Sequence, residues 1–384
     1  MKTPCYIINQ KELDASLDGF KKALNSHFTH SIASYSVKTN SLPYLLKRAR
    51  DKGYYAEVVS EDEYQLAIEC GFRTDQIVYN GPLKSKETFL EAIEGGALIN
   101  IETFREIEWL KELKHDKSHE VGIRMNINIS SISPADENHP DDNSRFGFSC
   151  ESGDFDKAVD LIQPINNVEL KRIHIHRTSK TRSVEFYSNL IEYAMMQLEM
   201  RHIKVNHIDV GGGYFGIMPN KPTYNDYASA ISRVLKKFVD MNETTIIIEP
   251  GNAIVASCFD FVTTVIDVKR HDNAFYVTVD GSRIDVDPFF HKYKFFNEFF
   301  FSKEKTESVS TQIICGCTCL EYDRLMTISD KPLLQVGDQI RFKRVGAYTM
   351  TLTPLFIRYW PTVYVDNGRE LNCVREKWCA NKLI

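Results

Sequence analysis

Regular alternation of strand-like and helix-like segments, from about residue 25 to residue 250, is the feature that most limits how this chain can fold. Apolar runs typical of strands are separated by amphipathic stretches such as Tyr44–Lys52, Glu61–Cys70 and Lys86–Ala92. The strand-like runs end near Val37, Val59, Tyr79, Ile101, Ile127, Ile175, Val210 and Ile248. Eight strand–helix units of this length predict a closed parallel (β/α)8 barrel over residues 25–253.

The pattern changes after Gly251. Helical spacing largely gives way to strand-like segments between turn residues: Phe259–Val268, Ala274–Val279, Thr311–Ile314 and Gln339–Lys343. These segments predict a second, mainly β domain in the C-terminal part of the chain. The aromatic stretch Phe289–Phe301 is interpreted as core and interface packing rather than as a ligand site.

Composition excludes several classes of function. A net charge of −5 over 384 residues gives no indication of nucleic-acid binding. The segment Met1–Cys5 does not open a signal peptide and no run of about 18 apolar residues occurs, so we expect a cytoplasmic protein without a membrane segment. Nine cysteines, an odd number, favour a reducing compartment over a disulfide framework.

Polar residues gather where the predicted strands end. In strand order they are Lys38, Glu57, Asn80 with Gly81, Arg124 with Asn126, His176, Asp209 with Gly211, and Glu249. Because the carboxyl ends of barrel strands face the active site, this rim is the predicted active site.

Lys38 closes the apolar run Ser31–Val37, where an amine is poorly solvated and suited to a Schiff base. Gly211, Gly212 and Gly213 follow the seventh strand, and Gly251 follows the eighth, where many such barrels bind phosphate. Each feature alone also fits a surface lysine or a tight turn. Together with Glu249, which can keep a ring nitrogen protonated, they predict pyridoxal 5′-phosphate as cofactor.

Several motifs make the chain resemble the fold type III, or alanine-racemase-type, pyridoxal-phosphate enzymes, and within them the ornithine and diaminopimelate decarboxylase branch. Tyr35-Ser36-Val37-Lys38-Thr39-Asn40 resembles Y-x-V-K-A-N, and His174-Ile175-His176-Arg177-Thr178-Ser179 resembles H-x-H-x-G-S. The family's glycine loop, E-P-G-R, G-A-Y and G-P-x-C-x-x-x-D are matched by Gly211–Gly213, Glu249–Asn252, Gly346–Tyr348, and Gly316–Cys319 with Asp323.

The resemblance implies roles for these residues. Lys38 would be the Schiff-base lysine, His176 would stack on the cofactor ring, and Glu249 would hold the ring nitrogen protonated. Cofactor contacts are implied for Lys38, Glu57, Arg124, His176, Ser179, Gly211, Gly212, Gly213, Glu249, Gly251, Asn252 and Tyr348. Cys319 would return a proton to Cα from the neighbouring subunit, so a homodimer with shared sites is expected. The N-terminal strand Tyr6–Ile8 would join the second domain, giving that domain residues 1–24 and 254–384.

Departures from the family concern the phosphate and the substrate. Asn252 replaces an arginine and Thr178 a glycine, so the phosphate site has one positive charge fewer, although Arg177 lies close in sequence. Glu57 stands in place of an aspartate. The substrate contacts implied by the resemblance are Asp287, Cys319, Leu320, Asp323 and Arg358.

Leu320 occupies the position where diamine-forming relatives have an acidic residue, and Asp287 the position of an arginine that grips the distal carboxylate of diaminopimelate. The aromatic and cationic stretch around Arg358 replaces F-N-G. These changes predict a modified, conjugated or carrier-tethered amino acid as substrate.

Decarboxylation of an amino acid is therefore the predicted activity, with catalytic roles for Lys38, His176, Glu249 and Cys319. A racemase on the same fold and a non-catalytic carrier of the cofactor are the alternatives. Cys315, Cys317 and Cys319 alternate on one predicted strand, but they lack the separated C-x2-C pairs of a structural zinc site, so no metal is expected.

Overall fold

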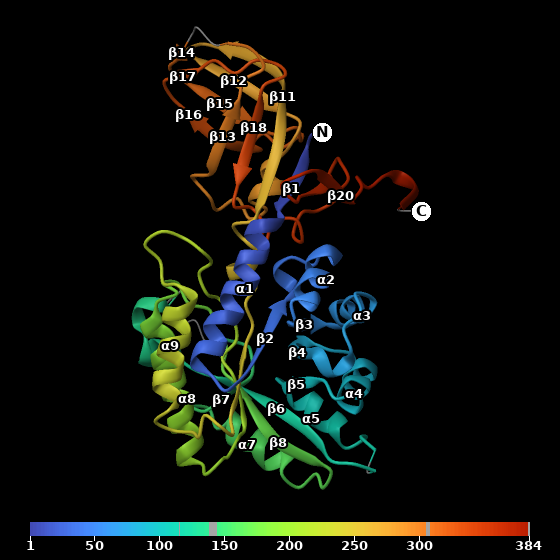
Figure 1. Ribbon diagram of the computed structural model, residues 1–384, viewed down its shortest axis with the longest axis vertical. Helices are drawn as coiled ribbons and strands as arrows, with labels where there is room; N and C mark the ends of the chain where they lie inside the picture. Colours follow the sequence, from blue (N-terminus) through green and yellow to red (C-terminus); the bar gives the residue numbers. More distant parts are fainter. Residues whose placement is uncertain (115, 138–143, 305–307, 383–384) are drawn as a thin grey trace. The chain divides into compact units, whose positions relative to one another are not determined.

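The structure is a computed structural model that describes residues 1–114, 116–137, 144–304 and 308–382 (Figure 1). The chain divides into two compact units. Residues 16–253 form one unit, and residues 1–15 together with residues 254–384 form the other. None of the helices in the described parts of the chain is long and apolar enough to cross a membrane.

Residues 16–253 contain the barrel, which the sequence predicted over residues 25–253. Eight parallel strands pair in the order β5-β4-β3-β2-β10-β9-β8-β6, and pairing of β5 with β6 closes the ring. The barrel strands are β2 (His30–Ser36), β3 (Tyr55–Ser60), β4 (Ile77–Leu83), β5 (Leu98–Ile101), β6 (His119–Asn126), β8 (Val168–His174), β9 (His207–Asp209) and β10 (Thr245–Ile248). The two-residue strand β7 (Phe148–Ser149) pairs with β6 outside the ring. The prediction of a closed (β/α)8 barrel is confirmed.

Helices flank these strands on both sides (Figure 1). They are α1 (Gln10–His27), α2 (Pro43–Asp51), α3 (Glu61–Glu69), α4 (Lys86–Glu94), α5 (Phe104–Leu110), α6 (Ile129–Ile132), α7 (Asp154–Ile162), α8 (Val184–Met200), α9 (Tyr224–Leu235) and α10 (Asn252–Val255). In α3, α4, α5, α8 and α9 the residue before the helix caps it through its side-chain oxygen: Ser60, Ser85, Thr103, Ser183 and Thr223. These caps fix where each helix begins, and therefore how the loops at the strand ends are shaped.

Residues 1–15 and 254–384 are mainly β, as predicted. One sheet has the order β16-β15-β12-β11-β1-β19-β20, and β18 with β13 extends from β11. Its strands are β1 (Cys5–Asn9), β11 (Phe259–His271), β12 (Ala274–Val279), β13 (Phe296–Phe300), β15 (Gln312–Cys315), β16 (Arg324–Ile328), β18 (Gln339–Lys343), β19 (Thr362–Asp366) and β20 (Leu371–Arg375). A small second sheet pairs β14 (Ser308–Val309) with β17 (Lys331–Pro332), and one short helix, α11 (Arg283–Val286), follows β12.

The N-terminal strand β1 is central in this β unit. It pairs antiparallel with β11 and parallel with β19, and Cys5 and Ile7 pack with Val262 in a buried cluster. The expectation that the N-terminal strand joins the C-terminal domain is therefore confirmed.

Candidate active site

Lys38 lies just beyond the carboxyl end of β2, in the 3-10 turn Val37–Thr39 rather than in the strand itself. Its Nζ atom donates to Oε1 and Oε2 of Glu57 at 2.7 and 2.6 Å. The Lys38 side chain is 37% exposed, whereas that of Glu57 is 1% exposed. The amine is thus reachable from solvent and held by a buried carboxylate, a better-solvated position than the sequence suggested.

A chain of buried amides continues from Glu57 across the barrel. Asn80, on β4, donates to Glu57 Oε1 at 3.2 Å and to Glu249 Oε1 at 2.5 Å. Asn100, on β5, donates to Asn80 Oδ1 at 2.8 Å and to Asp209 Oδ2 at 3.0 Å. Strand ends that are far apart in the sequence are therefore joined by side-chain hydrogen bonds in one polar network.

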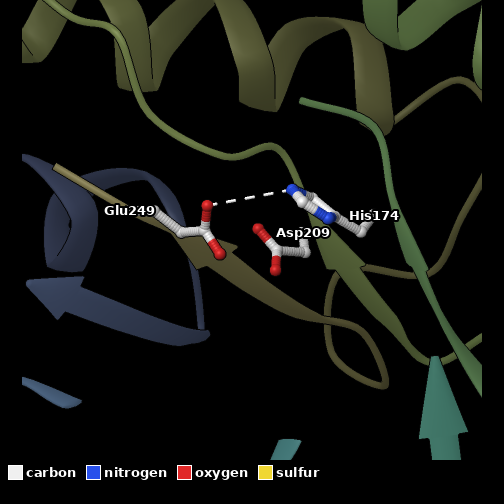
Figure 2. Close-up of side chains that lie close together, drawn as sticks. All are labelled: His174, Asp209 and Glu249. Atoms are coloured by element: carbon white, nitrogen blue, oxygen red, sulfur yellow. Dashed lines mark ion pairs between the residues drawn. The ribbon is translucent and has the colours of Figure 1, made fainter. Parts of the chain in front are cut away.

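His174, Asp209 and Glu249 form the buried end of this network (Figure 2). One side-chain nitrogen or oxygen atom of each residue lies within 4.8 Å of the corresponding atoms of the other two. His174 Nε2 is 3.8 Å from Glu249 Oε2. Burial and the neighbouring Asp209 raise the pKa of Glu249 well above its ordinary value, and burial lowers the pKa of His174 well below its own. These shifts favour the protonated form of Glu249 and the uncharged form of His174.

His176 follows β8 and lies against the glycine loop after β9. Its Nδ1 accepts the backbone N–H of Gly212 at 3.3 Å, and its ring is stacked with that of His174 at a centroid distance of 6.3 Å. Burial lowers the pKa of His176 well below its ordinary value. The His176 ring is therefore neutral, and one of its nitrogen atoms is fixed by the loop.

Arg124 fixes the backbone beside His176. Its Nη2 donates to the His176 carbonyl at 3.3 Å, and its Nη1 donates to Glu102 Oε1 at 2.9 Å. Glu102, which the sequence did not single out, also accepts the backbone N–H of Gly81 at 2.6 Å. Among the described contacts, the Arg124 guanidinium therefore holds the backbone of His176 in place.

The glycines of both loops are required by close packing. A Cβ atom on Gly212 would lie 2.2 Å from the Glu249 carbonyl oxygen, and one on Gly251 would lie 2.0 Å from Thr39 Oγ1. Gly211 adopts a φ of +76°, which disfavours any side chain there. The backbone of these loops can therefore approach a bound group closely.

The predicted phosphate residues are only partly brought together. Gly213 lies in the loop after β9 and Asn252 begins the short helix α10 after β10. The Ser179 hydroxyl, however, donates to Asp136 Oδ1 and accepts from the Arg182 backbone N–H. Asp136, which the sequence did not indicate, also accepts from the Thr181 hydroxyl at 2.6 Å. A phosphate contact by Ser179 stays a prediction, since its hydroxyl is engaged by Asp136.

In the β unit, Cys319 is exposed in the loop between β15 and β16. Asp323 organises this loop: its carboxylate accepts from the hydroxyl of Ser282 at 2.9 Å, the hydroxyl of Thr318 at 2.6 Å and the backbone N–H of Arg283 at 2.8 Å. Leu320 and Asp323 close a turn through a backbone bond of 2.9 Å, so Leu320 is not in a strand. The implied substrate contact by Asp323 stays a prediction. Its carboxylate holds the loop between β15 and β16 in shape through these hydrogen bonds.

Two further predicted substrate residues make ion pairs within the β unit. Asp287 Oδ2 accepts from Arg283 Nη2 at 2.8 Å, and its oxygens also accept two backbone N–H groups. Arg358 pairs with the buried Asp285. Tyr348 is 42% exposed and adopts a φ of +53°. Substrate roles for Asp287 and Arg358 stay predictions whose charged groups are already paired.

The barrel site has the donors and acceptors that pyridoxal 5′-phosphate requires. It supplies an accessible amine on Lys38, a protonated carboxyl on Glu249, a neutral histidine ring, and glycine loops into which a Cβ atom would not fit. A (β/α)8 barrel with this set of groups defines a pyridoxal-phosphate enzyme.

Comparisons with known proteins agree. Residues 11–256 match the family model described as pyridoxal-dependent decarboxylase, pyridoxal binding domain. The chain belongs to this family of pyridoxal-phosphate-dependent decarboxylases, and pyridoxal 5′-phosphate is its cofactor.

Related proteins cover nearly the whole chain. The chain is 26% identical to diaminopimelate decarboxylase of Bacteroides thetaiotaomicron over 358 aligned residues. This alignment covers 91% of each of the two chains. It is 25% identical over 401 residues to that of Archaeoglobus fulgidus, covering 100% of this chain and 92% of the relative.

Solved structures share the fold. Diaminopimelate decarboxylase of M. jannaschii in complex with L-lysine superposes with a TM-score of 0.85 at 23% identity, over 100% of this chain and 91% of that chain. Arginine decarboxylase of Paramecium bursaria Chlorella virus superposes with a TM-score of 0.80 at 20% identity, over 95% of this chain and 96% of that chain.

Proposed function

We propose that this enzyme removes the α-carboxylate of an amino acid bound through a Schiff base at the site of Lys38. The observation that carries the proposal is the joining of Lys38 and Glu249 by one hydrogen-bond network through Glu57 and Asn80. When bound, pyridoxal 5′-phosphate withdraws electrons from the substrate Cα, most effectively with its ring nitrogen protonated.

The residues divide this work among them. Lys38 would hold the cofactor aldehyde through its amine and would release it to the substrate amine, while Glu57 holds the lysine in place. Glu249 would supply a proton to the ring nitrogen, and the neutral His176 ring would pack against the cofactor ring. Cys319 of the neighbouring subunit returns a proton to Cα after carbon dioxide leaves, the task of a general acid.

Lys38→Ala tests the reaction. We expect it to remove both turnover and the Schiff-base absorbance of the bound cofactor, because no other amine replaces it.

Cys319→Ala should keep that absorbance and lose roughly 10²–10⁴-fold in kcat, the usual contribution of a general acid. Lys47→Ala, at an exposed position on α2, is the matched control and should change neither.

A Lys38→Ala enzyme that still decarboxylates would contradict the assignment. Chiral analysis of the recovered substrate separates the alternatives: a racemase inverts it without releasing carbon dioxide, and a non-catalytic carrier leaves it unchanged.

The substrate we propose is a modified, conjugated or carrier-tethered amino acid. Leu320 supports this, because a leucine cannot neutralise a distal ammonium in a closed site and an unpaired buried charge costs several kcal/mol. Glu321 follows Leu320 within the turn and is exposed, so it is the nearest carboxylate in sequence that could take over that task. The second candidate is meso-diaminopimelate, which is favoured by the names of the relatives.

Steady-state kinetics distinguish these substrates. We expect kcat/KM for ornithine, lysine, arginine and meso-diaminopimelate to stay below about 10⁴ M⁻¹s⁻¹, the lower end for enzymes on their own substrates. Leu320→Glu should raise the value for the substrates with a distal ammonium, and Leu320→Met is its uncharged control. A wild-type value above that threshold for any of the four would identify an ordinary substrate instead.

A further inference from the structure

A second carboxyl group, that of Asp209, lies beside Glu249 and has no part in the proposed mechanism. Asp209 ends β9 and is 0% exposed, and Glu249 follows β10 and is 4% exposed. Figure 2 shows the two carboxyl groups next to each other, with His174 beside them. Two carboxylates this close in a buried site do not both ionise, so the pair holds one proton.

The hydrogen bonds place the negative charge on Asp209. Its Oδ1 accepts the Gly211 backbone N–H at 3.0 Å and its Oδ2 accepts Asn100 Nδ2 at 3.0 Å. Glu249 Oε1 accepts an N–H from Asn80 at 2.5 Å. Burial raises the pKa of Asp209 to about 6, and burial with the neighbouring Asp209 raises the pKa of Glu249 well above its ordinary value. The hydrogen bond between the two carboxyl groups lowers the pKa of Asp209 and raises that of Glu249, so the proton of the pair belongs to Glu249.

The other charged groups near this pair do not change which carboxyl group carries the proton. Arg172, on β8, favours the charged form of Asp209, and Lys38 favours that of Glu249, while Glu57 opposes ionisation of both. His174 does not take the proton, because burial lowers its pKa and both its ring nitrogens lack a hydrogen-bond partner among the described residues.

The same side chains have a spacing that a metal ion could use, but their hydrogen bonds argue for a shared proton. Three of the four carboxylate oxygens already accept N–H groups, from Gly211, Asn100 and Asn80. Each N–H donor takes one lone pair of its oxygen, and the hydrogen bond between the two carboxyl groups holds a proton where a cation would otherwise balance their charge.

We propose that Asp209 is a positioning residue that keeps Glu249 protonated before the cofactor binds, so that the protein itself supplies the proton for the cofactor's ring nitrogen. On loading, Glu249 releases its proton to that nitrogen and becomes the carboxylate of the resulting ion pair, with no proton drawn from solvent for this step. The inference rests on the proposed role of Glu249 and adds the origin of the proton.

Asp209→Asn tests the proposal, because the amide keeps the shape of the carboxyl and removes its charge. Pyridoxal 5′-phosphate is titrated into cofactor-free protein at pH 8 by calorimetry, in two buffers with different ionisation enthalpies. We expect the variant to take up more protons per site than wild type, at most one more, because without the Asp209 charge Glu249 is ionised in a larger fraction of the cofactor-free protein, although burial and Glu57 still raise its pKa. By linkage, its Kd should rise more steeply with pH than that of wild type, by at most about tenfold more per pH unit. Asp62→Asn, at an exposed position on α3, is the control and should match wild type.

Equal proton uptake and equal pH dependence in wild type and Asp209→Asn overturn the inference. If Asp209→Asn does not fold, difference infrared spectroscopy of cofactor-free wild type against Glu249→Gln at pH 8 decides instead. A protonated carboxyl band lost in Glu249→Gln supports the inference, and the absence of that band in wild type overturns it. A wild type that does not bind the cofactor at all overturns the proposed function, a distinct outcome.

Discussion

Glu63 shows how a single buried carboxyl near the site affects the stability of the protein. It lies in the first turn of α3, and its Oε2 accepts the Val59 backbone N–H at 2.9 Å. Burial, followed by the charge of Glu57, raises the pKa of Glu63 from 4.5 to about 7. A raised carboxyl pKa means that the folded protein binds this proton more tightly than the unfolded chain does.

Glu63→Gln should therefore change the pH dependence of stability. The wild-type free energy of unfolding falls by roughly 2–3 kcal/mol between pH 4.5 and pH 7 through this group, because ionisation is harder in the folded state. The variant lacks this fall, since Gln still accepts the Val59 N–H and carries no charge. Denaturant unfolding at pH 4.5 and pH 8 measures the difference.

The nearby Glu61→Gln is the control, because Glu61 is exposed on the same turn. Its pH curve should follow that of wild type. Parallel curves for Glu63→Gln and wild type would show that Glu63 ionises as easily in the folded protein as in the unfolded chain.

The sequence predicted which residues lie on the rim, but not how they pair. Lys38, Glu57, Asp209 and Glu249 were found because strand ends of a parallel barrel share one face. Their pairing was not predicted, and Asn100, which donates to Asp209 from a position 109 residues away in the chain, was not singled out. Pairing across a barrel depends on strand register and side-chain length, which a single sequence does not display.

At the scale of secondary structure, the long periodic elements were predicted and the short ones were not. Strand β4 continues to Leu83, four residues beyond the predicted end, because Leu83 still pairs with Ser60 of β3 after a register shift, although Gly81 adopts a φ of +81°. The four-residue helix α11 was missed, since it is shorter than the window that reveals helical periodicity. That helix explains the ion pair of Arg283 and Asp287, which are spaced i and i+4.

The loop after β10 packs directly on the turn that carries Lys38, and Gly251 makes this contact possible. Gly251→Ala would place a Cβ atom 2.0 Å from Thr39 Oγ1 and 3.0 Å from Ser36 Cβ. We expect a loss of about 1–3 kcal/mol in the free energy of unfolding, and weaker cofactor binding because Lys38 shifts. Fluorescence titration with pyridoxal 5′-phosphate and thermal unfolding measure the two effects.

Thr39→Ala removes the atom that the new methyl group meets, so the double variant should recover part of both losses. Gly19→Ala is the control, because its Cβ atom would lie 3.5 Å from Tyr224, an ordinary contact. If the effects of Gly251→Ala and Thr39→Ala on unfolding free energy and cofactor binding are fully additive, the contact with Thr39 is not the cause of the losses in Gly251→Ala.

At the scale of the whole molecule, the β unit exposes large apolar side chains that a subunit interface would cover. Phe289, Tyr293 and Phe296 are 60%, 93% and 58% exposed, and Tyr322 is 62% exposed. Aromatic residues are enriched in the buried centres of subunit interfaces. These exposures support the proposed homodimer, in which Cys319 of one subunit serves the partner's site.

Mixing Lys38→Ala with Cys319→Ala should restore activity. Random exchange makes half of the dimers hybrid, and each hybrid has one intact site of two, so recovery approaches about a quarter of wild type. Light scattering checks the dimer mass, and a tagged subunit reports exchange. If the subunits exchange but no turnover is recovered, Lys38 and Cys319 of one subunit act in the same site. Each variant mixed with itself is the control.

Because β1 lies between β11 and β19, the β unit contains pairs such as Cys5 with Thr362, which lie at nearly opposite ends of the chain. During synthesis, residues 16–253 leave the ribosome with all their barrel strands before β19 exists. Strand β1 must wait for that partner, and closing so long a loop slows folding. The first-made strand is thus among the last to be fully paired, so its exposed edge is where a nascent chain needs protection from aggregation.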